Sequence, residues 1–307
     1  MKETFEPCGV LLIDKPAGMT SHDVVGKVRR LYHTRKVGHT GTLDPMATGV
    51  LVILIGRAAK AAEYLSVHNK TYEAVMRLGL TTDTEDITGQ ILTEIPAENL
   101  PSAADVEAVL PAFRGEILQI PPMYSALKVD GHKLCDLARA GQTVVRQPRP
   151  VTVKELTMTP SSVSGDYLLT VRCSGGTYIR TLCADIGASL GCGGVMATLR
   201  RTEAGGFPIG DCITLDALEE LSFEARFALL RPVEGLFEDL PTVCLPDFYR
   251  NLCRNGCEIY QKKIGTLYPI GQRVRLCDAQ GRFFALGEAG EYEDGSAIKA
   301  IKLFALN

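Results

Sequence analysis

The sequence predicts an α+β protein with a larger mixed domain and a small C-terminal β domain. Up to about residue 241, strand and helix patterns follow one another irregularly, without the steady strand–helix–strand order of a parallel α/β sheet. Beyond that point only short strand patterns remain. A chain of 307 residues is also long enough for about two domains. We therefore expect one domain at 1–241, carrying an inserted lobe at about 121–150, and a second at 242–307.

The N-terminal segment predicts a strand, a turn and a helix. Residues 10–13 are apolar and run into the turn at 15–18, where proline and glycine interrupt the strand. Ser21 is expected to cap the next helix, because apolar residues recur at helical spacing from Val24 to Tyr32. The opposite face of this helix is basic. We interpret that face as solvated surface, with a phosphate contact as the alternative.

The following segments predict strands around a glycine-rich turn. The turn lies at 38–41, a buried strand follows at 50–55, and a second strand is expected at 72–78. Ser102 opens a predicted helix that Pro111 kinks, because proline removes a helical hydrogen bond.

The remaining elements divide into a basic lobe, a covering layer and the C-terminal strands. The cationic residues of the lobe at 121–150 are Lys128, Lys133, Arg139, Arg146 and Arg149. Alternation over 168–173 predicts a strand, and apolar spacing from 182 to 190 predicts a helix. Two acidic helices between about 214 and 231, ended by Pro232, are expected to cover the sheet. The C-terminal strands are expected at 273–277, 283–286 and 298–306.

The length of the apolar runs and the N-terminal residues argue against a membrane-spanning or secreted protein. The longest apolar run, at 50–55, is far shorter than the roughly 20 residues of a membrane helix. Glu3 and Glu6 stand where a signal peptide carries positive and then apolar sequence, so we expect a cytoplasmic protein.

Ten cysteines are scattered without a Cys-x-x-Cys pair. We interpret them as small buried hydrophobes. The alternative is a zinc site at Cys253 and Cys257, with Cys244 and Cys277 nearby.

Net charge argues against a nucleic-acid-binding protein. The chain has 33 basic and 36 acidic residues, for a net charge of −3, whereas nucleic-acid-binding domains are usually basic. The charge is uneven, however. Residues 1–60 carry nine basic and five acidic side chains, 121–205 carry ten and six, and 242–307 carry nine and seven. Positive charge is therefore available, but only folding can gather it on one face.

Asp44 is the strongest candidate for chemistry. The spacing of Gly38 and Gly41 is too short for a phosphate loop, and no zinc-binding helix, nucleophile elbow or dinucleotide fingerprint is present. The simpler interpretation of Asp44 is a turn residue, because Asp before Pro initiates turns. A functional carboxylate needs a cation that favours its charged form, and Arg180, at a predicted strand end, is the candidate. No cofactor is expected.

Six separated motifs together resemble the bacterial TruB-type tRNA pseudouridine synthases. The motifs are Lys15-Pro-Ala-Gly-Met-Thr-Ser21, Gly38-His-Thr-Gly-Thr-Leu-Asp-Pro-Met-Ala-Thr-Gly-Val-Leu51, Lys70-Thr-Tyr72, Thr82-Asp-Thr-Glu-Asp-Ile-Thr-Gly89, Pro122-Met-Tyr-Ser-Ala-Leu-Lys128 and Gly176-Thr-Tyr-Ile-Arg180. The resemblance covers nearly the whole chain in order. It implies a pseudouridine-synthase-like mixed sheet with flanking helices, in which the lobe at 121–150 is the thumb. It also implies that 242–307 is a PUA-like RNA-binding domain, although only strand pattern and position support that part.

The implied activity is isomerisation of the uridine at position 55 in the T loop of tRNA. The reaction breaks the N1–C1′ bond of a flipped-out base, rotates the uracil and rejoins it through C5, so it requires neither a redox cofactor nor a metal. An aspartate nucleophile is implied, and attack on uracil C6 or on ribose C1′ both stay open. The T arm is the implied partner. We expect a monomer that requires no protein partner.

The resemblance also assigns roles to single residues. It implies that Asp44 is the nucleophile, Arg180 its ion-pair partner, and Tyr72 the active-site tyrosine that stacks on the base or transfers a proton. His39, Tyr178 and Leu199 match positions that line the RNA or base pocket. Lys15 and Lys60 match basic positions near the site, and Asp86 is expected to support it through hydrogen bonds.

Other interpretations remain for these residues and for the chain. His39 is otherwise a structural histidine, Tyr72 an ordinary strand aromatic, and the two lysines surface residues. The chain itself is alternatively a non-catalytic tRNA-binding protein or RNA chaperone on the same scaffold. A third alternative is a nucleotide-phosphate enzyme that uses residues 38–41.

Overall fold

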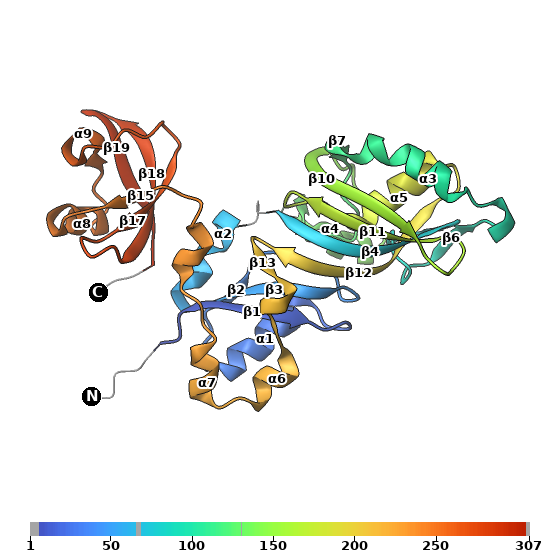
Figure 1. The fold of residues 1–307 in the computed structure, drawn as a ribbon, viewed down its shortest axis with the longest axis horizontal. Helices are drawn as coiled ribbons and strands as arrows, with labels where there is room; N and C mark the ends of the chain where they lie inside the picture. Colours follow the sequence, from blue (N-terminus) through green and yellow to red (C-terminus); the bar gives the residue numbers. More distant parts are fainter. Residues whose placement is uncertain (1–5, 66–68, 130, 305–307) are drawn as a thin grey trace.

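The computed structural model describes residues 6–65, 69–129 and 131–304, which form two main β-sheets with helices around them (Figure 1). The larger sheet has the strand order β14-β1-β3-β12-β4-β11-β10-β7, with β2 paired to β3 and β13 to β12. The smaller sheet has the order β15-β17-β18-β19-β16. This confirms the α+β class, with a large mixed sheet and a C-terminal β domain.

The strands of the larger sheet are β1 (Gly9–Lys15), β2 (Val37–His39), β3 (Thr48–Ile55), β4 (Lys70–Leu78), β7 (Gly115–Gln119), β10 (Arg149–Pro160), β11 (Asp166–Cys173), β12 (Gly194–Ala204), β13 (Phe207–Pro208) and β14 (Ile213–Thr214). The smaller sheet contains β15 (Thr242–Cys244), β16 (Ile259–Tyr260), β17 (Arg273–Cys277), β18 (Phe283–Tyr292) and β19 (Gly295–Leu303). Two short ribbons pair β5 (Leu80–Thr82) with β6 (Ile91–Glu94) and β8 (Lys128–Val129) with β9 (His132–Lys133).

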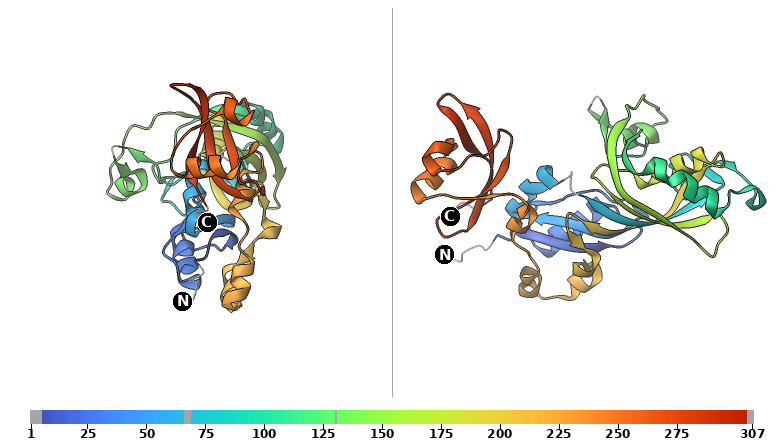
Figure 2. Two further views of the ribbon diagram at one scale, coloured as in Figure 1. Left: turned by 90° about the vertical axis from the view of Figure 1, so that its left-hand side faces the viewer. Right: turned by 45° about the horizontal axis from the view of Figure 1, so that its top comes forward.

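The helices cover both halves of the larger sheet and one side of the smaller one (Figure 2). They are α1 (Ser21–Leu31), α2 (Ala62–Leu65), α3 (Ala103–Val109), α4 (Leu134–Arg139), α5 (Ile179–Ser189), α6 (Leu215–Glu220), α7 (Phe223–Ala228), α8 (Asp247–Arg254) and α9 (Gln261–Ile264). Short 3₁₀ helices lie at Gly56–Ala61, Ala97–Asn99, Leu110–Phe113, Ile209–Asp211 and Val233–Phe237. Among the described helices, none is long and apolar enough to span a membrane.

Two local predictions are wrong. Thr20, rather than Ser21, is the N-cap of α1: its side chain accepts from Asp23 N while the Asp23 carboxylate accepts from Thr20 N, which forms a capping box. Ser21 is instead buried and bonds to the backbone of Leu43. Residues 38–39 are not in a turn but in strand β2, because β3 offers them a pairing edge. Pro111 does end α3, which passes into a 3₁₀ helix.

Strand β12 joins the two halves of the larger sheet, and sequence patterning missed it. Its C-terminal part pairs parallel with β3, and its whole length pairs antiparallel with β4. Strands β3 and β12 approach each other so closely that a Cβ on Gly49 would lie 2.2 Å from the carbonyl oxygen of Arg201. Gly49 has φ +105°, which other residues rarely adopt. A glycine at this point therefore permits the junction.

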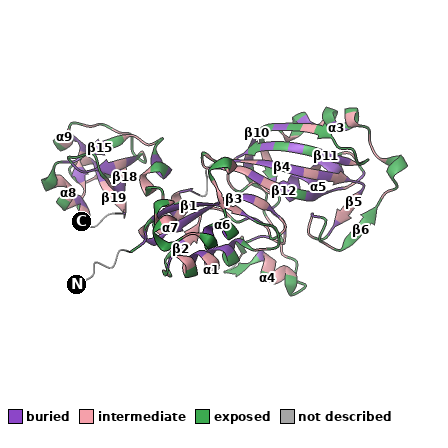
Figure 3. Ribbon diagram, turned by 60° about the horizontal axis from the view of Figure 1, so that its bottom comes forward, coloured by how far each residue is buried: buried purple, intermediate pink, exposed green. Residues whose placement is uncertain are grey.

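Apolar clusters fill the layers on each side of the sheet. One cluster lies between strands β4 and β10–β12 and helices α3 and α5. A second packs α1 and α6 against β1 and β3. Figure 3 shows the buried residues running along these strands, while much of α3 is exposed. The smaller sheet has a cluster of its own.

The C-terminal sheet packs on the larger domain through aromatic side chains. Phe237 lies 5.9 Å from Phe283 and 5.7 Å from Phe304, measured between ring centroids. Both rings belong to the same apolar cluster as Val10 and Val50 of the larger sheet. Lys302 also pairs with Glu63 of α2. The two domains therefore share buried surface.

The cysteines were expected to be small buried hydrophobes, and only some of them are buried. Cys253 and Cys277 are buried in the C-terminal domain, but Cys244 and Cys257 are exposed. In the part of the chain that the structure describes, no three His, Cys, Asp or Glu side chains gather where they could hold a metal ion.

We predict that Phe237→Ala lowers the free energy of unfolding by about 3–5 kcal/mol, because it leaves a cavity where the two domains share a core. Urea denaturation measures this change. Phe248→Ala is the matched control: Phe248 is 67% exposed, so its loss should change stability by no more than about 0.5 kcal/mol. Equal effects of the two substitutions would contradict the shared core.

Candidate active site

Asp44 and Arg180 form the central ion pair of the larger domain. Arg180 Nε donates to Asp44 Oδ2 at 2.9 Å, and Nη2 donates to Oδ1 at 3.2 Å. This two-point geometry fixes the plane of the carboxylate. The Arg180 side chain is 5% exposed, whereas that of Asp44 is 32% exposed. The cation is thus buried while the carboxylate stays accessible.

Arg180 also holds two other segments at the site. Its Nη1 donates to Thr84 O at 2.9 Å, and its Nη2 donates to Tyr124 O at 2.8 Å. Thr84 belongs to the turn between β5 and β6, and Tyr124 lies at the root of the lobe at 121–150. One side chain therefore fixes the positions of both segments relative to Asp44.

Asp86 supports this arrangement from the β5–β6 turn. Its Oδ2 lies 3.8 Å from Arg180 Nη1, and its Oδ1 accepts from Thr84 Oγ1 and from both N and Oγ1 of Thr88. The structure thus places the predicted supporting residue beside the ion pair. Glu85, which the sequence analysis missed, adopts φ +62° and bonds to Thr181 at the start of α5. Burial raises the pKa of Glu85.

Lys15 and Ser21 brace the loop that carries Asp44. The buried Lys15 ammonium donates to the carbonyls of Pro16, Met19 and Pro45 at 2.8, 2.6 and 3.2 Å. Ser21 Oγ accepts from Leu43 N at 2.8 Å. Lys15 is therefore no surface lysine. It fixes the residue that follows Asp44, and Ser21 fixes the one before it.

Tyr72 and Leu199 lie on neighbouring strands in the same apolar cluster as Leu43. Tyr72, on β4, is 6% exposed, and Leu199, on β12, pairs with Ala74. Burial raises the pKa of Tyr72, while the charge of Arg201 lowers it. The structure thus brings both predicted pocket residues into the cluster beside the Asp44 loop.

His39 and Tyr178 are both held by hydrogen bonds to neighbouring segments. His39 Nδ1 accepts from Gly41 N, and burial, with the charge of Arg201, lowers the pKa of the ring. Tyr178 is the N-cap of α5, and Gln119 bonds to both its backbone N and its O. Burial raises the pKa of Tyr178.

Lys60 stands on the 3₁₀ helix at Gly56–Ala61, and its ammonium is 3.5 Å from Leu303 O of the C-terminal domain. No hydrogen bond or ion pair in the described structure joins Lys60 to Asp44. Its expected place near the site stays a prediction.

Arg201 and Lys70 are the buried cations that sequence reasoning missed. Arg201 is 1% exposed and donates to Val50 O and Gly41 O. Lys70 is 8% exposed, and burial, with the charge of Arg201, lowers its pKa to about 8. The signal that could have revealed Arg201 was the pair of consecutive arginines at 200 and 201. Successive side chains on a strand point to opposite faces of the sheet, so one of the two arginines points inward.

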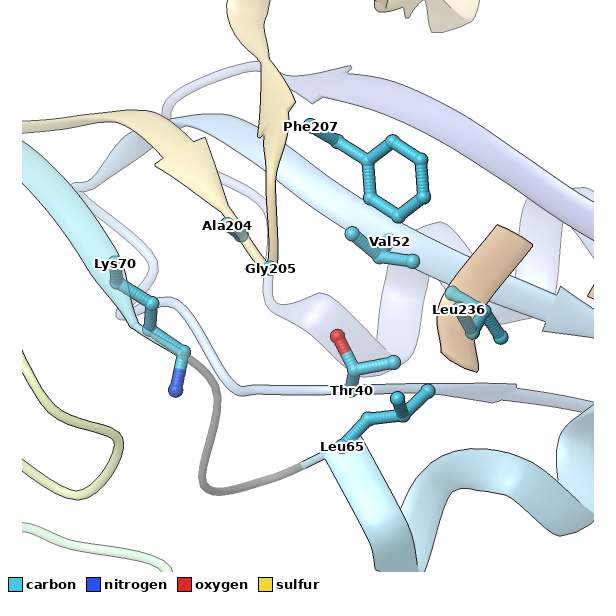
Figure 4. A pocket seen from close by; sticks show the side chains of 8 residues that line it. All are labelled: Thr40, Val52, Leu65, Lys70, Ala204, Gly205, Phe207 and Leu236. Atoms are coloured by element: carbon cyan, nitrogen blue, oxygen red, sulfur yellow. The ribbon is translucent and has the colours of Figure 1, made fainter. Parts of the chain in front are cut away.

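A small pocket next to the site is lined by residues other than those around Asp44 (Figure 4). Lys70 of β4 lies at one side of it, while Thr40, Leu65 and Leu236 lie together at the other. The residues that line the pocket include neither Asp44 nor Tyr72.

Comparisons with known proteins agree with the fold. The TruB family pseudouridylate synthase N-terminal domain model matches residues 29–179, and the tRNA pseudouridylate synthase B C-terminal domain model matches 180–238. These matches define the class of protein as a pseudouridine-forming isomerase. More specifically, the chain belongs to the TruB family of pseudouridylate synthases.

Relatives and solved structures extend the likeness over most of the chain. The tRNA pseudouridine synthase B of Stutzerimonas stutzeri (strain A1501) is 45% identical over 288 residues, which is 92% of each chain. That of Burkholderia mallei (strain NCTC 10247) is 42% identical over 92% of this chain and 93% of its own. A chain from the crystal structure of a Cbf5-Nop10-Gar1 complex aligns with a TM-score of 0.73 and 28% identity, covering 97% of this chain and 85% of that one.

We predict that Lys15 makes stability depend on pH. Burial lowers its pKa to about 8 in the folded state, against about 10.4 in an unfolded chain. Between these values the unfolded chain binds more protons, so the contribution of Lys15 to stability rises with pH and is least favourable below about pH 8. The free energy of unfolding of the wild type should therefore rise by roughly 2–3 kcal/mol relative to Lys15→Met across this window.

Urea titrations of both proteins at several pH values measure the difference. A constant difference from pH 8 upward would show that the Lys15 ammonium has an ordinary pKa.

Proposed function

We propose that this enzyme isomerises the uridine at position 55 in the T loop of tRNA, with Asp44 as the nucleophile. The observation that carries the proposal is the two-point bond between buried Arg180 and the accessible Asp44 carboxylate. A charged carboxylate held in one orientation suits covalent catalysis, because an adduct splits one difficult step into two easier ones. The similarity to proteins named tRNA pseudouridine synthase B supports tRNA as the substrate.

The surroundings of Asp44 suit a uracil extruded from its stack. Tyr72 and Leu199 supply an aromatic and an apolar surface beside the Asp44 loop. A base in a folded loop reaches such a site only by flipping, which costs a few kcal/mol. Stacking on these side chains and phosphate contacts offset that cost. His39 and Tyr178 are proposed to line the entrance.

The lobe at 121–150 is proposed to act as the thumb that holds RNA over the site. Its ribbon is largely exposed, its helix is half-buried, and the two carry the cations Lys128, Lys133 and Arg139. Phosphate contacts from such residues position RNA without reading its sequence. Because the Tyr124 carbonyl at the root of the lobe bonds to Arg180, thumb position and carboxylate orientation are physically joined.

Residues 242–307 are proposed to form a PUA-like accessory RNA-binding domain, with its boundary near residue 241. Most arginines there are paired: Arg273 with Glu288, Arg275 with Glu234 and Arg282 with Asp278. Lys262 and Lys263, by contrast, are exposed on α9 and have no ion pair within the described residues. These lysines are the best candidates for phosphate contacts.

We further propose that the enzyme works in the cytoplasm as a monomer, without a protein partner, metal or redox cofactor. The isomerisation has the same atoms in substrate and product, so no group has to be supplied.

We predict that Asp44→Asn abolishes turnover while affinity for a T-arm hairpin stays within about tenfold, or 1.4 kcal/mol. The change preserves size but removes the nucleophilic charge. Release of hydrogen from C5-labelled uridine measures the reaction, and it also distinguishes an enzyme from a non-catalytic RNA chaperone.

Asp211→Asn is the matched control, since Asp211 pairs with Arg231 on the surface and should leave turnover unchanged. Multiple turnover by an Asp44→Asn preparation free of wild-type enzyme would refute the assignment of the nucleophile.

We predict that the double variant Lys262→Ala, Lys263→Ala binds full tRNA more weakly and with a shallower salt dependence. Loss of two phosphate contacts should reduce the log–log slope by about 1 to 2. The full chain is used because truncation would expose Phe237. The saturated single-turnover rate on a T-arm hairpin is the internal control and should change less than about twofold. Unchanged affinity and slope would exclude α9 from the RNA-binding surface.

A further inference from the structure

Arg201 is a buried cation whose hydrogen bonds are incomplete. Its Nε donates to Val50 O at 2.7 Å and its Nη2 to Gly41 O at 3.1 Å. Nη1 is buried without an acceptor among the described residues, and no carboxylate there forms an ion pair with the side chain. An unsatisfied buried donor costs about 1–3 kcal/mol. The hydrogen bonds to the two carbonyls therefore leave one nitrogen of the guanidinium, Nη1, without a role.

The register of the sheet places Arg201 directly opposite Tyr72. The two residues are paired across β12 and β4, so their side chains leave the sheet on the same face with Cβ atoms about 5 Å apart. Both are buried, at 1% and 6% exposure. Burial raises the pKa of the phenol, and the charge of the guanidinium lowers it.

Three further titratable groups surround this pair. Cys173 faces Tyr72 from β11, and Asp44 faces it from the loop after β2; both act to raise the pKa of the phenol. Lys70, two residues before Tyr72 on β4, lies next to Arg201 and Gly41. In this group Arg201 is the side chain whose charge favours a negatively charged phenolic oxygen.

We propose that Arg201 is a positioning residue for Tyr72, with Nη1 as the donor to the phenolic oxygen during proton transfer. A guanidinium has donors only, so this bond directs the hydroxyl proton away from Arg201. The same bond stabilises the oxygen when it loses that proton. The inference rests on the proposed function, because it takes Tyr72 as the group that moves the proton.

The proton balance of the isomerisation fits one phenol acting twice. When the N1–C1′ bond breaks, the electron pair goes to N1, which takes the Tyr72 proton and leaves a phenolate beside Arg201, while an Asp44 oxygen bonds to C1′. After the uracil rotates, C5 occupies the place that N1 left and bonds to C1′, and the Asp44 oxygen leaves with its electron pair as the carboxylate. The phenolate then takes the C5 proton, and the electrons of that C–H bond return to the ring. Tyr72 ends as a phenol, and no outside base is consumed.

The test measures the ionisation of residue 72 directly in the full chain. A fluorinated tyrosine is incorporated at position 72, because its phenol titrates nearer to neutral pH, and its ¹⁹F signal is followed against pH without RNA. We expect the titration midpoint to rise by at least one pH unit in Arg201→Gln. Arg200→Gln is the matched control: Arg200 pairs with Asp14, so its loss should leave the midpoint unchanged.

Equal midpoints in the wild type and Arg201→Gln would overturn the proposal and leave Arg201 as a brace for the Asp44 loop. Should Arg201→Gln fail to fold, Arg201→Met serves instead, because an apolar residue of similar volume in place of a buried ion is often tolerated. The titration needs neither RNA nor turnover. Its failure is therefore distinguishable from a failure of the proposed function, which the hydrogen-release assay tests.

Discussion

The contacts of the Arg180 guanidinium are the constraint on which the site depends. They join Asp44, the β5–β6 turn and the root of the lobe at 121–150, three segments that are far apart in the sequence. Burying a guanidinium is costly unless its N–H donors have acceptors. Each of the three segments supplies one of these acceptors, so the position of each segment depends on the other two. Removing Arg180 would leave both the carboxylate and two backbone carbonyls without their partner. The site is for this reason a single cooperative unit.

Several buried cations explain how an acidic protein can act on RNA. Arg180, Arg201, Lys15 and Lys70 are all buried around the Asp44 loop, although the net charge of the chain is −3. Buried charges are screened by salt much less than surface charges. The field at the site is therefore set by these few residues, and the acidic helix α6 lies on a different part of the domain (Figure 1).

Much of the fold was predictable because its signals are local. The apolar run at 50–55 and the alternation at 168–173 correspond to β3 and β11. β12 was not predicted, since a strand that bridges two half-sheets is buried by both of its neighbours and shows no clean alternation. The contact of Lys60 with the C-terminal domain was not predicted either, because it joins residues far apart in the sequence.

The sequence by itself determined the elements, the motif residues and the family resemblance, because these depend on residue type and spacing along the chain. Only the tertiary structure decided which side chains meet. Asp44 and Arg180 are separated by 136 residues, and the pairing of Arg201 with Tyr72 follows from the register of β12 on β4. The physical reason is that a shift of one residue in that register would turn Arg201 to the opposite face and bring its neighbour inward. Long-range pairing is a property of the packed sheet, and no local pattern contains it.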